Sequence, residues 1–323
     1  MIYRAKMSIN SPDVSNWSLY FNITEGCNNS CCFCASNSPE QGNYSLSTEK
    51  ICMSLCKYSL DANSQVVING GEPTTHLGFI QILDCAIKTG GRVILFTNGK
   101  ALANKKFFEK IDWHKLFRIS IPIYSAKKDL HDRLVGKNGA WNQTMMGLNN
   151  LDIAREAGLG PSEVELKLLA IRPSLSEWLG VIDEICKFKK HPERVVISGL
   201  ILSKTILSHQ LELIPTMDDL VTPVNQAVRQ LRAILIKTIQ LWSIPWCVLD
   251  KDNLEYFLNH DSDQEHKILP MPLKEMYFDY RYPEGIELTS QVSTIPISLP
   301  PECLNCKIPL PCVGKPEYLL LSK

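Results

Sequence analysis

Three cysteines near the N-terminus have a spacing that suits an iron–sulfur cluster. Cys27, Cys31 and Cys34 are separated by three and by two residues, and they directly follow the first predicted strand. Thiolates are the usual ligands of a [4Fe–4S] cluster, and a complete set has four. Three thiolates would leave one iron open, in the way that catalytic metal sites keep one position free. We therefore predict a metal site with an open iron in this loop, and we expect the adjacent Cys32 to point away from it.

The loop also carries an aromatic residue, Phe33, immediately before its last cysteine. The pattern Cys-x3-Cys-x-aromatic-Cys resembles the signature of the radical S-adenosylmethionine (SAM) superfamily. A zinc knuckle and a ferredoxin-type cluster are the alternatives, but zinc sites usually pair two Cys-x2-Cys units or add histidines, and no histidine lies nearby. The resemblance implies an enzyme in which the open iron binds SAM and one electron cleaves it to methionine and a 5′-deoxyadenosyl radical. That radical would abstract hydrogen from a substrate carbon.

Two further motifs of this superfamily follow the next two predicted strands. Gly70-Gly71-Glu72 resembles the GGE motif beside the SAM amine, where glycines let the backbone approach the ligand and a carboxylate lies near an ammonium group. Thr97-Asn98-Gly99 matches the common TNG motif. Ordinary turns also favour both sequences, so the resemblance rests on their order, with each motif at the end of its own strand.

The fourth and fifth predicted strands agree less closely with the superfamily. Many members end the fourth strand with a Ser-x-Asp-Gly-like sequence that helps to hold SAM, whereas this chain has Pro-Ile-Tyr-Ser at 122–125. On the fifth strand, Lys167 or Arg172 could pair with the SAM carboxylate. The resemblance implies these SAM-binding residues: Phe33, Gly70, Gly71, Glu72, Thr97, Asn98, Ser125 and Lys167.

The elements that would position these motifs alternate between strands and helices. Apolar runs predict strands at 18–24, 65–69, 92–97, 117–124, 163–171 and 194–201, with helical patterns between them. Six β–α repeats predict an α/β fold, a partial (β/α)6 barrel of parallel strands, and nearly continuous apolar strands fit a sheet covered on both faces. Ligands of such sheets bind at the carboxyl ends of the strands, which is where all the motifs lie.

The character of the chain changes near residue 215. The pattern at 218–242 predicts one long amphipathic helix, and Pro-rich irregular stretches follow it. We therefore expect a radical SAM partial barrel over residues 1–215 and a helix with a small Cys-rich module over 216–323.

A second group of cysteines lies in that C-terminal region. Cys303, Cys306 and Cys312, with Cys247 upstream, resemble the auxiliary-cluster regions of SPASM and twitch proteins. Four cysteines are too few for the two extra clusters of SPASM, so the resemblance implies one additional [4Fe–4S] cluster in a twitch-like module. A structural zinc on the same thiols is one alternative, and Cys247 as a hydrogen-atom donor to a substrate radical is another. The remaining cysteines are expected to pack within helices: Cys52, Cys56, Cys85 and Cys186.

Composition and charge exclude some other classes of protein. Lys plus Arg and Asp plus Glu each number 34, so the net charge of zero disfavours nucleic-acid binding through a broad basic face. No apolar run is long enough to span a bilayer, and the N-terminus lacks the apolar region of a signal peptide. We expect a cytoplasmic protein, in which 12 cysteines indicate metal sites and not a disulfide framework.

The resemblance also suggests substrates and partners. Superfamily members with an auxiliary cluster often crosslink, epimerise or oxidise ribosomally made peptides, so a peptide is the expected substrate. Because 26 residues precede Cys27, we expect no N-terminal peptide-binding domain, and a separate recognition protein or direct binding would take its place. A small-molecule enzyme of cofactor or antibiotic biosynthesis is one alternative, and a non-catalytic iron–sulfur or zinc protein is another. An electron donor such as flavodoxin or ferredoxin is the other expected partner.

Overall fold

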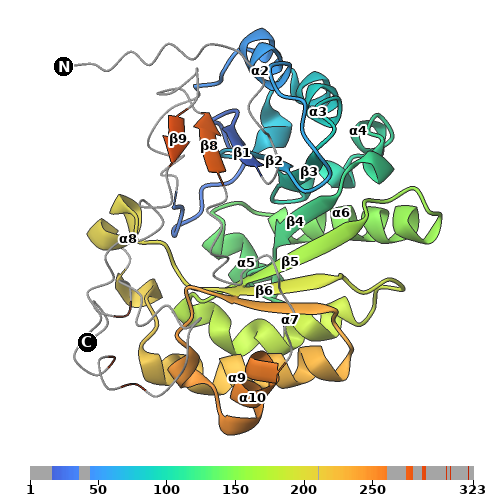
Figure 1. Cartoon of the computed structure of the whole chain (residues 1–323). Coiled ribbons are helices and arrows are strands. Elements are labelled where there is room, and N and C mark those ends of the chain that lie inside the picture. The colour runs from blue at the N-terminus through green and yellow to red at the C-terminus, as the bar shows by residue number, and fades with distance from the viewer. Residues whose placement is uncertain are drawn as a thin grey trace.

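The computed structural model describes residues 17–35, 44–209, 211–259, 274–278 and 286–288, together with Cys303, Cys306 and Leu319. Within these residues one nine-stranded sheet organises the chain (Figure 1). Seven parallel strands lie side by side in chain order: β1 (Trp17–Asn22), β2 (Gln65–Asn69), β3 (Arg92–Phe96), β4 (Arg118–Pro122), β5 (Glu163–Leu169), β6 (Arg194–Ser198) and β7 (Thr238–Trp242).

Two strands from the C-terminal part of the chain extend the sheet beyond β1. Strand β8 (Lys274–Phe278) pairs parallel with β1, and β9 (Ile286–Leu288) pairs antiparallel with β8. Figure 1 shows both beside β1. The predicted α/β architecture is therefore confirmed, and the sheet is wider than the six strands that the sequence suggests.

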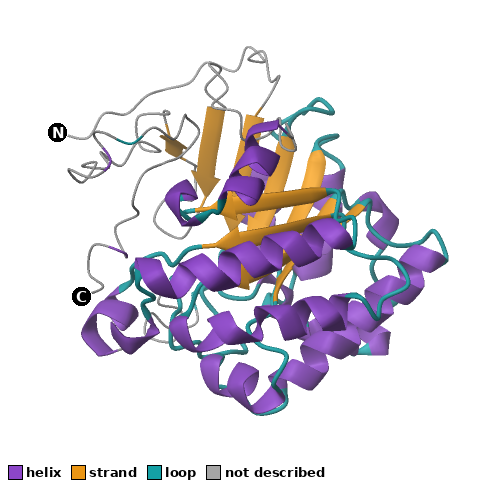
Figure 2. Ribbon diagram, turned by 90° about the horizontal axis from the view of Figure 1, so that it is seen from below, coloured by secondary structure: helices purple, strands orange, loops and turns teal. Residues whose placement is uncertain are grey.

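Helices connect the strands and gather along the outside of the sheet (Figure 2). The α-helices are α2 (Thr48–Leu55), α3 (Phe79–Ile87), α4 (Lys105–Phe108), α5 (Lys128–Leu134), α6 (Ala140–Glu156), α7 (Trp178–Ile185), α8 (Lys204–His209), α9 (Met217–Ala233) and α10 (Lys251–Asn259). Short 3-10 turns are η1 (Pro73–Thr75), η2 (Lys100–Ala103), η3 (Trp113–Lys115), η4 (Arg172–Glu177), η5 (Leu211–Leu213) and η6 (Trp246–Val248). No helix among the described residues is long and apolar enough to cross a membrane.

The two faces of the sheet differ in chemistry. One face carries a continuous row of buried apolar side chains in the main hydrophobic core, which runs across five strands through Phe21, Ile68, Leu95, Ile119 and Val164. Such burial is the main source of stability for the fold.

The opposite face is polar over β4 to β6. Ser120 pairs in register with Glu165, and Glu165 pairs with Arg194, so these buried polar side chains share that face. The expectation of apolar strands on both faces therefore holds for β2 and β3, where Val67 and Ile94 are also buried, and on this face of β4 to β6 the one buried apolar side chain is Val196. The alternation of polar and apolar residues in those strands reflects two different environments.

The long helix predicted over 218–242 is wrong in its last third. Helix α9 begins with a capping box at Thr216 and Asp219 and ends at Ala233. Leu235 then has a positive φ of 59°, which a helix does not tolerate, and the chain turns into β7. Strand β7 pairs with β6, so the sheet continues past residue 215. Pairing at the open edge of the sheet outweighs the helical periodicity of the sequence.

The scattered cysteines also differ from expectation. Cys52 on α2 and Cys85 on α3 form a disulfide, because these neighbouring helices bring their Cα atoms to 5.5 Å. Cys56 and Cys186 are exposed and are not packed within helices as predicted. Both lie at the C-terminal caps of their helices, α2 and α7, where side chains reach solvent.

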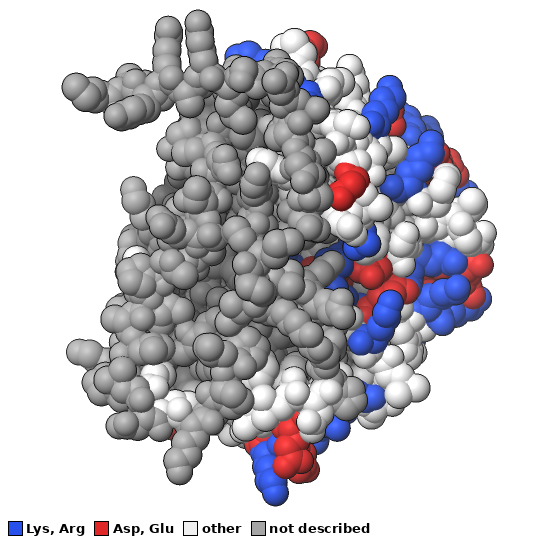
Figure 3. Space-filling view, viewed as in Figure 1, with Lys and Arg blue, Asp and Glu red and all other residues white. Residues whose placement is uncertain are grey.

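Charged side chains are mixed on the described surface. On the face in Figure 3, Lys and Arg side chains are interspersed with Asp and Glu side chains over the described residues. This agrees with the zero net charge of the sequence.

Candidate active site

The three motif cysteines lie together on the loop after β1. Their side chains are partly buried, and burial is the main cause that raises the pKa of the Cys27 thiol. The pKa of Cys31 is held well above its usual range by burial and then by the neighbouring thiols of Cys34 and Cys27. Groups that affect one another in this way are near neighbours in space. The loop therefore brings three thiols into one place at the carboxyl end of the sheet.

One side of this loop is hydrogen-bonded to the backbone at the end of α5. The Ser30 amide donates to the Val135 carbonyl at 2.8 Å, and the Cys32 amide donates to the Leu134 carbonyl at 3.1 Å. Gly136 follows with a φ of +62°, and a Cβ there would lie 2.5 Å from the Ser30 carbonyl oxygen. A glycine is needed at this position because the two backbones touch.

The other side of the loop is hydrogen-bonded to the residues that follow β3. Asn98 Nδ2 donates to Asn28 Oδ1 at 2.7 Å. Lys100 Nζ donates to the Asn28 carbonyl and to Asn29 Oδ1, each at 2.8 Å. The Asn29 amide in turn donates to Cys27 Sγ at 3.4 Å. The TNG motif is thus joined to the cysteine loop through its own Asn98 and through the lysine that follows it.

The two glycines of the GGE motif accommodate the backbone that leads into the cysteine loop. A Cβ on Gly70 would lie 2.4 Å from the Thr24 carbonyl oxygen, and one on Gly71 would lie 2.4 Å from that of Glu25. The Gly71 amide donates to the Thr24 carbonyl at 2.7 Å, and the amide that follows donates to the Gly26 carbonyl at 2.8 Å. The close approach predicted for a ligand is therefore made, in this structure, by the chain itself.

The Glu72 carboxylate is buried and connects the ends of β2 and β3. Its Oε1 accepts from the Thr74 amide at 3.1 Å, from Thr74 Oγ1 at 2.6 Å and from Thr97 Oγ1 at 2.7 Å. Its Oε2 accepts from the Asn98 amide at 2.7 Å. Burial raises the pKa of this carboxyl group, and the hydrogen bonds oppose the rise. Both oxygens are thus directed at donors of the same chain.

Three ring side chains pack against one another beside the cysteine thiols. The ring centroids of Phe33 and Tyr124 are 4.7 Å apart, and those of Tyr124 and His131 are 5.5 Å apart. Burial, followed by the nearby thiols, raises the pKa of Tyr124 well above its usual range. His131 is 2% exposed, its Nδ1 has no hydrogen-bond partner among the described residues, and burial lowers its pKa to about 4.

The last two predicted SAM-binding residues lie in different settings. Ser125 is fully buried, and its Oγ accepts from the Lys127 amide at 2.8 Å, which makes it a turn-stabilising residue. Lys167 lies on the polar face of the sheet, with Nζ 4.0 Å from the Phe96 ring centroid and 3.8 Å from Glu165 Oε1. Its side chain is 31% exposed, and burial is the main cause that lowers the pKa of its amino group.

A network of ion pairs lies at the amino end of the same face. Glu165 accepts from Ser120 Oγ at 2.7 Å, and its carboxylate lies 3.7 Å from Arg118 and 3.6 Å from Arg194. Arg118 also donates to Glu163 at 2.8 Å. These buried charges are neutralised by one another, as buried charges usually are.

The C-terminal cysteines are described only in part. Cys247 is exposed on η6, and the Cys306 amide donates to the Cys303 carbonyl at 3.2 Å. Cys312 lies outside the described residues. The grouping of these four thiols therefore stays a prediction.

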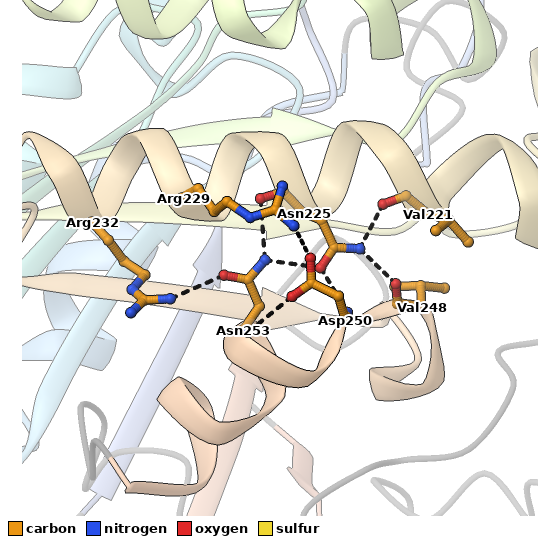
Figure 4. Close-up of polar contacts among 7 residues, drawn as sticks. All are labelled: Val221, Asn225, Arg229, Arg232, Val248, Asp250 and Asn253. Atoms are coloured by element: carbon orange, nitrogen blue, oxygen red, sulfur yellow. Dashed lines mark hydrogen bonds and ion pairs between the residues drawn. The ribbon is translucent and has the colours of Figure 1, made fainter.

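The turn that carries Cys247 is fixed by two buried asparagines (Figure 4). Asn225 on α9 donates to the Val248 carbonyl at 2.8 Å and accepts from the Asp250 amide at 2.8 Å. Asn253 Nδ2 donates to Asn225 Oδ1 at 2.9 Å. This network holds η6 and α10 against α9.

Sequence reasoning missed several residues that hold the site. They are Asn28, Asn29, Lys100, Tyr124 and His131, and none of them belongs to the family pattern used for the prediction. A signal existed for three of them, because Asn28 and Asn29 lie inside the cysteine motif and Lys100 directly follows the TNG motif.

Curated proteins resemble the chain in sequence over about half of its length. An AdoMet-dependent heme synthase from Methanosarcina barkeri is 29% identical over 147 residues, which are 44% of this chain and 40% of that protein. A probable GTP 3′,8-cyclase from Saccharolobus islandicus is 29% identical over 185 residues, or 54% of this chain and 57% of that protein. The chain thus spans about half the length of the curated relatives that it matches.

A solved structure shows the same fold. Streptococcus suis SuiB bound to its precursor peptide SuiA aligns with a TM-score of 0.56 over 82% of this chain and 58% of SuiB, at 11% identity. The family model of the radical SAM superfamily matches residues 21–188, which is more than half of the 323 residues and includes the three cysteines, the GGE motif and the TNG motif. The chain therefore belongs to the radical SAM superfamily, whose enzymes use a [4Fe–4S] cluster and S-adenosylmethionine.

Proposed function

We propose that this chain cleaves SAM reductively at a [4Fe–4S] cluster bound by Cys27, Cys31 and Cys34, and that the resulting 5′-deoxyadenosyl radical abstracts hydrogen from a substrate carbon. The observation that carries the proposal is the loop of three neighbouring thiols, held from both sides at the carboxyl end of a parallel sheet. The bound cluster would supply the electron for cleavage, and the protein would position SAM and substrate.

The residues present fit such a cluster. Three soft thiol donors suit iron–sulfur chemistry, and the Asn29 amide already donates to one of the sulfurs. Among the described residues, no three His, Cys, Asp or Glu side chains surround a point where a single metal ion could sit. A cluster places each thiolate on a different iron, so its ligands need not converge on one point.

For SAM itself we propose contacts from Phe33, the backbone of Gly70 and Gly71, and the Thr97–Asn98 segment. Lys167 is proposed to bind the SAM carboxylate, because its partly exposed side chain lies on the polar face of the sheet. Glu72 and Ser125 accept hydrogen bonds from donors of their own chain, and we propose that they order the site.

We also propose a second [4Fe–4S] cluster on Cys247, Cys303, Cys306 and Cys312, in a twitch-like region. The rigid turn around Cys247 supports this, because a cluster ligand must be held in place. A structural zinc on the same thiols and a hydrogen-donor role for Cys247 are the competing proposals.

For the location of the protein we propose the cytoplasm, because a [4Fe–4S] cluster with an open iron favours a reducing compartment. The Cys52–Cys85 disulfide argues for a more oxidising compartment.

For the substrate we propose a ribosomally made peptide, by analogy of fold with the SuiB structure that contains its precursor peptide. A small molecule is the second candidate, because the curated relatives by sequence are named for heme synthesis and GTP cyclisation. A flavodoxin or ferredoxin as electron donor and a separate peptide-recognition protein complete the proposed partners.

Anaerobic reconstitution tests the central proposal. The wild-type chain should bind about four irons, or about eight if the tail holds a second cluster, and should release 5′-deoxyadenosine when given SAM and dithionite. Cys31→Ala should lose the product and the irons of the first cluster. Cys32→Ala is the matched control in the same loop and should retain both. A fully loaded wild-type protein that makes no 5′-deoxyadenosine would exclude the proposed function.

The substrate classes separate in a second experiment. The loaded enzyme is incubated with SAM and with peptides encoded beside its gene, and the peptides are examined for a mass change. A change in mass supports the peptide proposal, and its absence together with turnover of a small molecule contradicts it.

A further inference from the structure

Lys100 is a buried cation without a carboxylate partner in the described part of the chain. It is 7% exposed, and both of its side-chain hydrogen bonds go to neutral oxygens, those of Asn28 and Asn29. Burying an ammonium group is costly unless a negative charge lies close to it. The other buried cations described here each have a carboxylate within ion-pair distance, which is Glu165 for Arg118 and Arg194 and Glu193 for Arg155. The counter-charge of Lys100 must therefore come from elsewhere.

The groups around Lys100 show where that charge belongs. Burial is the main cause that lowers the pKa of Lys100, and Lys137 lowers it further, whereas Cys27, Glu72 and Cys31 favour the charged form. Both oxygens of Glu72 accept hydrogen bonds, from Thr74, Thr97 and Asn98, and neither lies within ion-pair distance of Lys100. The cysteine thiols become anionic when they bind iron. A thiolate-bound cluster would thus supply the missing negative charge.

Lys100 also acts on a cysteine sulfur through a second path. It holds the Asn29 side chain at 2.8 Å, and the amide of the same residue donates to Cys27 Sγ at 3.4 Å. Hydrogen bonds to cluster sulfurs and the charge around a cluster are two of the factors that set its reduction potential. One lysine therefore affects both factors at the same loop.

We propose that Lys100 is a positioning residue of the SAM-cleaving cluster, and that its ammonium is the counter-charge which keeps the cluster reducible. The inference rests on the proposed function, since it requires a cluster on Cys27, Cys31 and Cys34. In the step concerned, the cluster gains one electron from the external reductant and becomes more negative by one charge. A nearby cation and an N–H···S hydrogen bond both stabilise that reduced state, so their loss makes reduction harder.

The test is an anaerobic redox titration of the reconstituted full-length chain with dithionite, followed by electron paramagnetic resonance of the reduced cluster. Lys100→Gln removes the charge but keeps a hydrogen-bond donor, and Lys100→Arg keeps the charge. We expect the ratio of reduced to oxidised cluster at a fixed potential to fall about tenfold in Lys100→Gln, which is about 59 mV for a one-electron couple. Lys100→Arg should stay within about threefold of the wild type. Asn29→Ala should shift the ratio in the same direction as Lys100→Gln and by less.

Lys88→Met is the control. Lys88 is exposed at the end of α3, just before the amino end of β3, so this variant removes the same charge at the end of the sheet opposite to the cysteine loop. An unchanged potential in a fully loaded Lys100→Gln would overturn the inference, as would an equal shift in Lys88→Met. If Lys100→Gln does not load, Lys100→Arg and Asn29→Ala decide the test. The inference is wrong when Asn29→Ala leaves the potential unchanged, or when Lys100→Arg lowers the ratio of reduced to oxidised cluster tenfold. A wild-type chain that binds no cluster, or releases no 5′-deoxyadenosine, would instead contradict the proposed function.

Discussion

The two ends of the sheet both bury charged side chains, but they treat the charges differently. At the amino end, two carboxylates, Glu163 and Glu165, lie within ion-pair distance of two guanidinium groups, Arg118 and Arg194, so opposite charges neutralise one another. At the carboxyl end, Glu72 and Lys100 are hydrogen-bonded only to neutral groups among the described residues. The buried charges at the amino end are thus paired with one another, whereas those at the carboxyl end have no ion-pair partner among the described residues and can act on a bound molecule.

This difference separates stability from function on one sheet. In parallel α/β folds the amino ends of the strands contribute stability, and the carboxyl ends carry the active site. A buried charge beside its counter-charge exerts a weaker net field on a ligand than a buried charge held only by amides and hydroxyls. The comparison therefore predicts different consequences for mutations at the two ends.

The largest effect on stability is expected at the amino end. Glu165→Ala leaves Arg118, Arg194 and Lys167 without their shared carboxylate, and it should lower the free energy of unfolding by about 3–5 kcal/mol. Urea denaturation of the cluster-free chain at pH 7 measures this change. A loss below about 1 kcal/mol would show that the network does not stabilise the fold, and would remove one side of the comparison.

A backbone contact at the carboxyl end should give the next largest effect. Gly71→Ala places a Cβ 2.4 Å from the Glu25 carbonyl oxygen, so the two loops must separate, at a cost of about 1–3 kcal/mol. Because one of these loops leads into Cys27, iron content after reconstitution should also fall. Gly158→Ala is the control: it has a φ of +72° but open space around it, and should keep its iron. Normal iron loading of Gly71→Ala would contradict the role given to this contact.

The buried His131 makes stability depend on pH. An ordinary histidine in the unfolded chain binds its proton near pH 6.5, whereas burial lowers the pKa in the folded chain to about 4. Between these values the unfolded state holds one proton more, so stability falls as the pH falls. From pH 7 to pH 5 we expect the cluster-free chain to lose about 2 kcal/mol through this residue. His131→Asn should flatten the dependence, and an unchanged slope would refute the assignment.

An exposed ion pair gives the baseline for these comparisons. Lys105 and Glu109 lie one turn apart on the surface of the molecule, with side chains 86% and 60% exposed. Such pairs are screened by solvent. Lys105→Ala should therefore leave the urea midpoint unchanged, and a clear shift would mean that exposed charge contributes more than the comparison assumes.

Much of the fold and the location of the site can be predicted from the sequence. The cysteine spacing, the GGE motif and the TNG motif are local patterns, and the strands before them are marked by short apolar runs, so their place at the carboxyl ends of β1, β2 and β3 follows from sequence order. The helix pattern at 218–242 failed because β7 is decided by its pairing with β6, which the local periodicity does not contain.

The roles of individual side chains depend on contacts across the chain. The presence of three thiols in one loop follows from the spacing of Cys27, Cys31 and Cys34. Lys100, in contrast, reaches Asn29 over 71 residues, and Thr97 reaches Glu72 over 25. Those partners are chosen by the register of the strands and the close approach of their loops, and hydrogen bonds form only between groups that tertiary structure brings within about 3 Å. The sequence by itself determined which chemistry is present and at which end of the sheet. Only the tertiary structure decided which buried charges are neutralised and which stay available to a bound molecule.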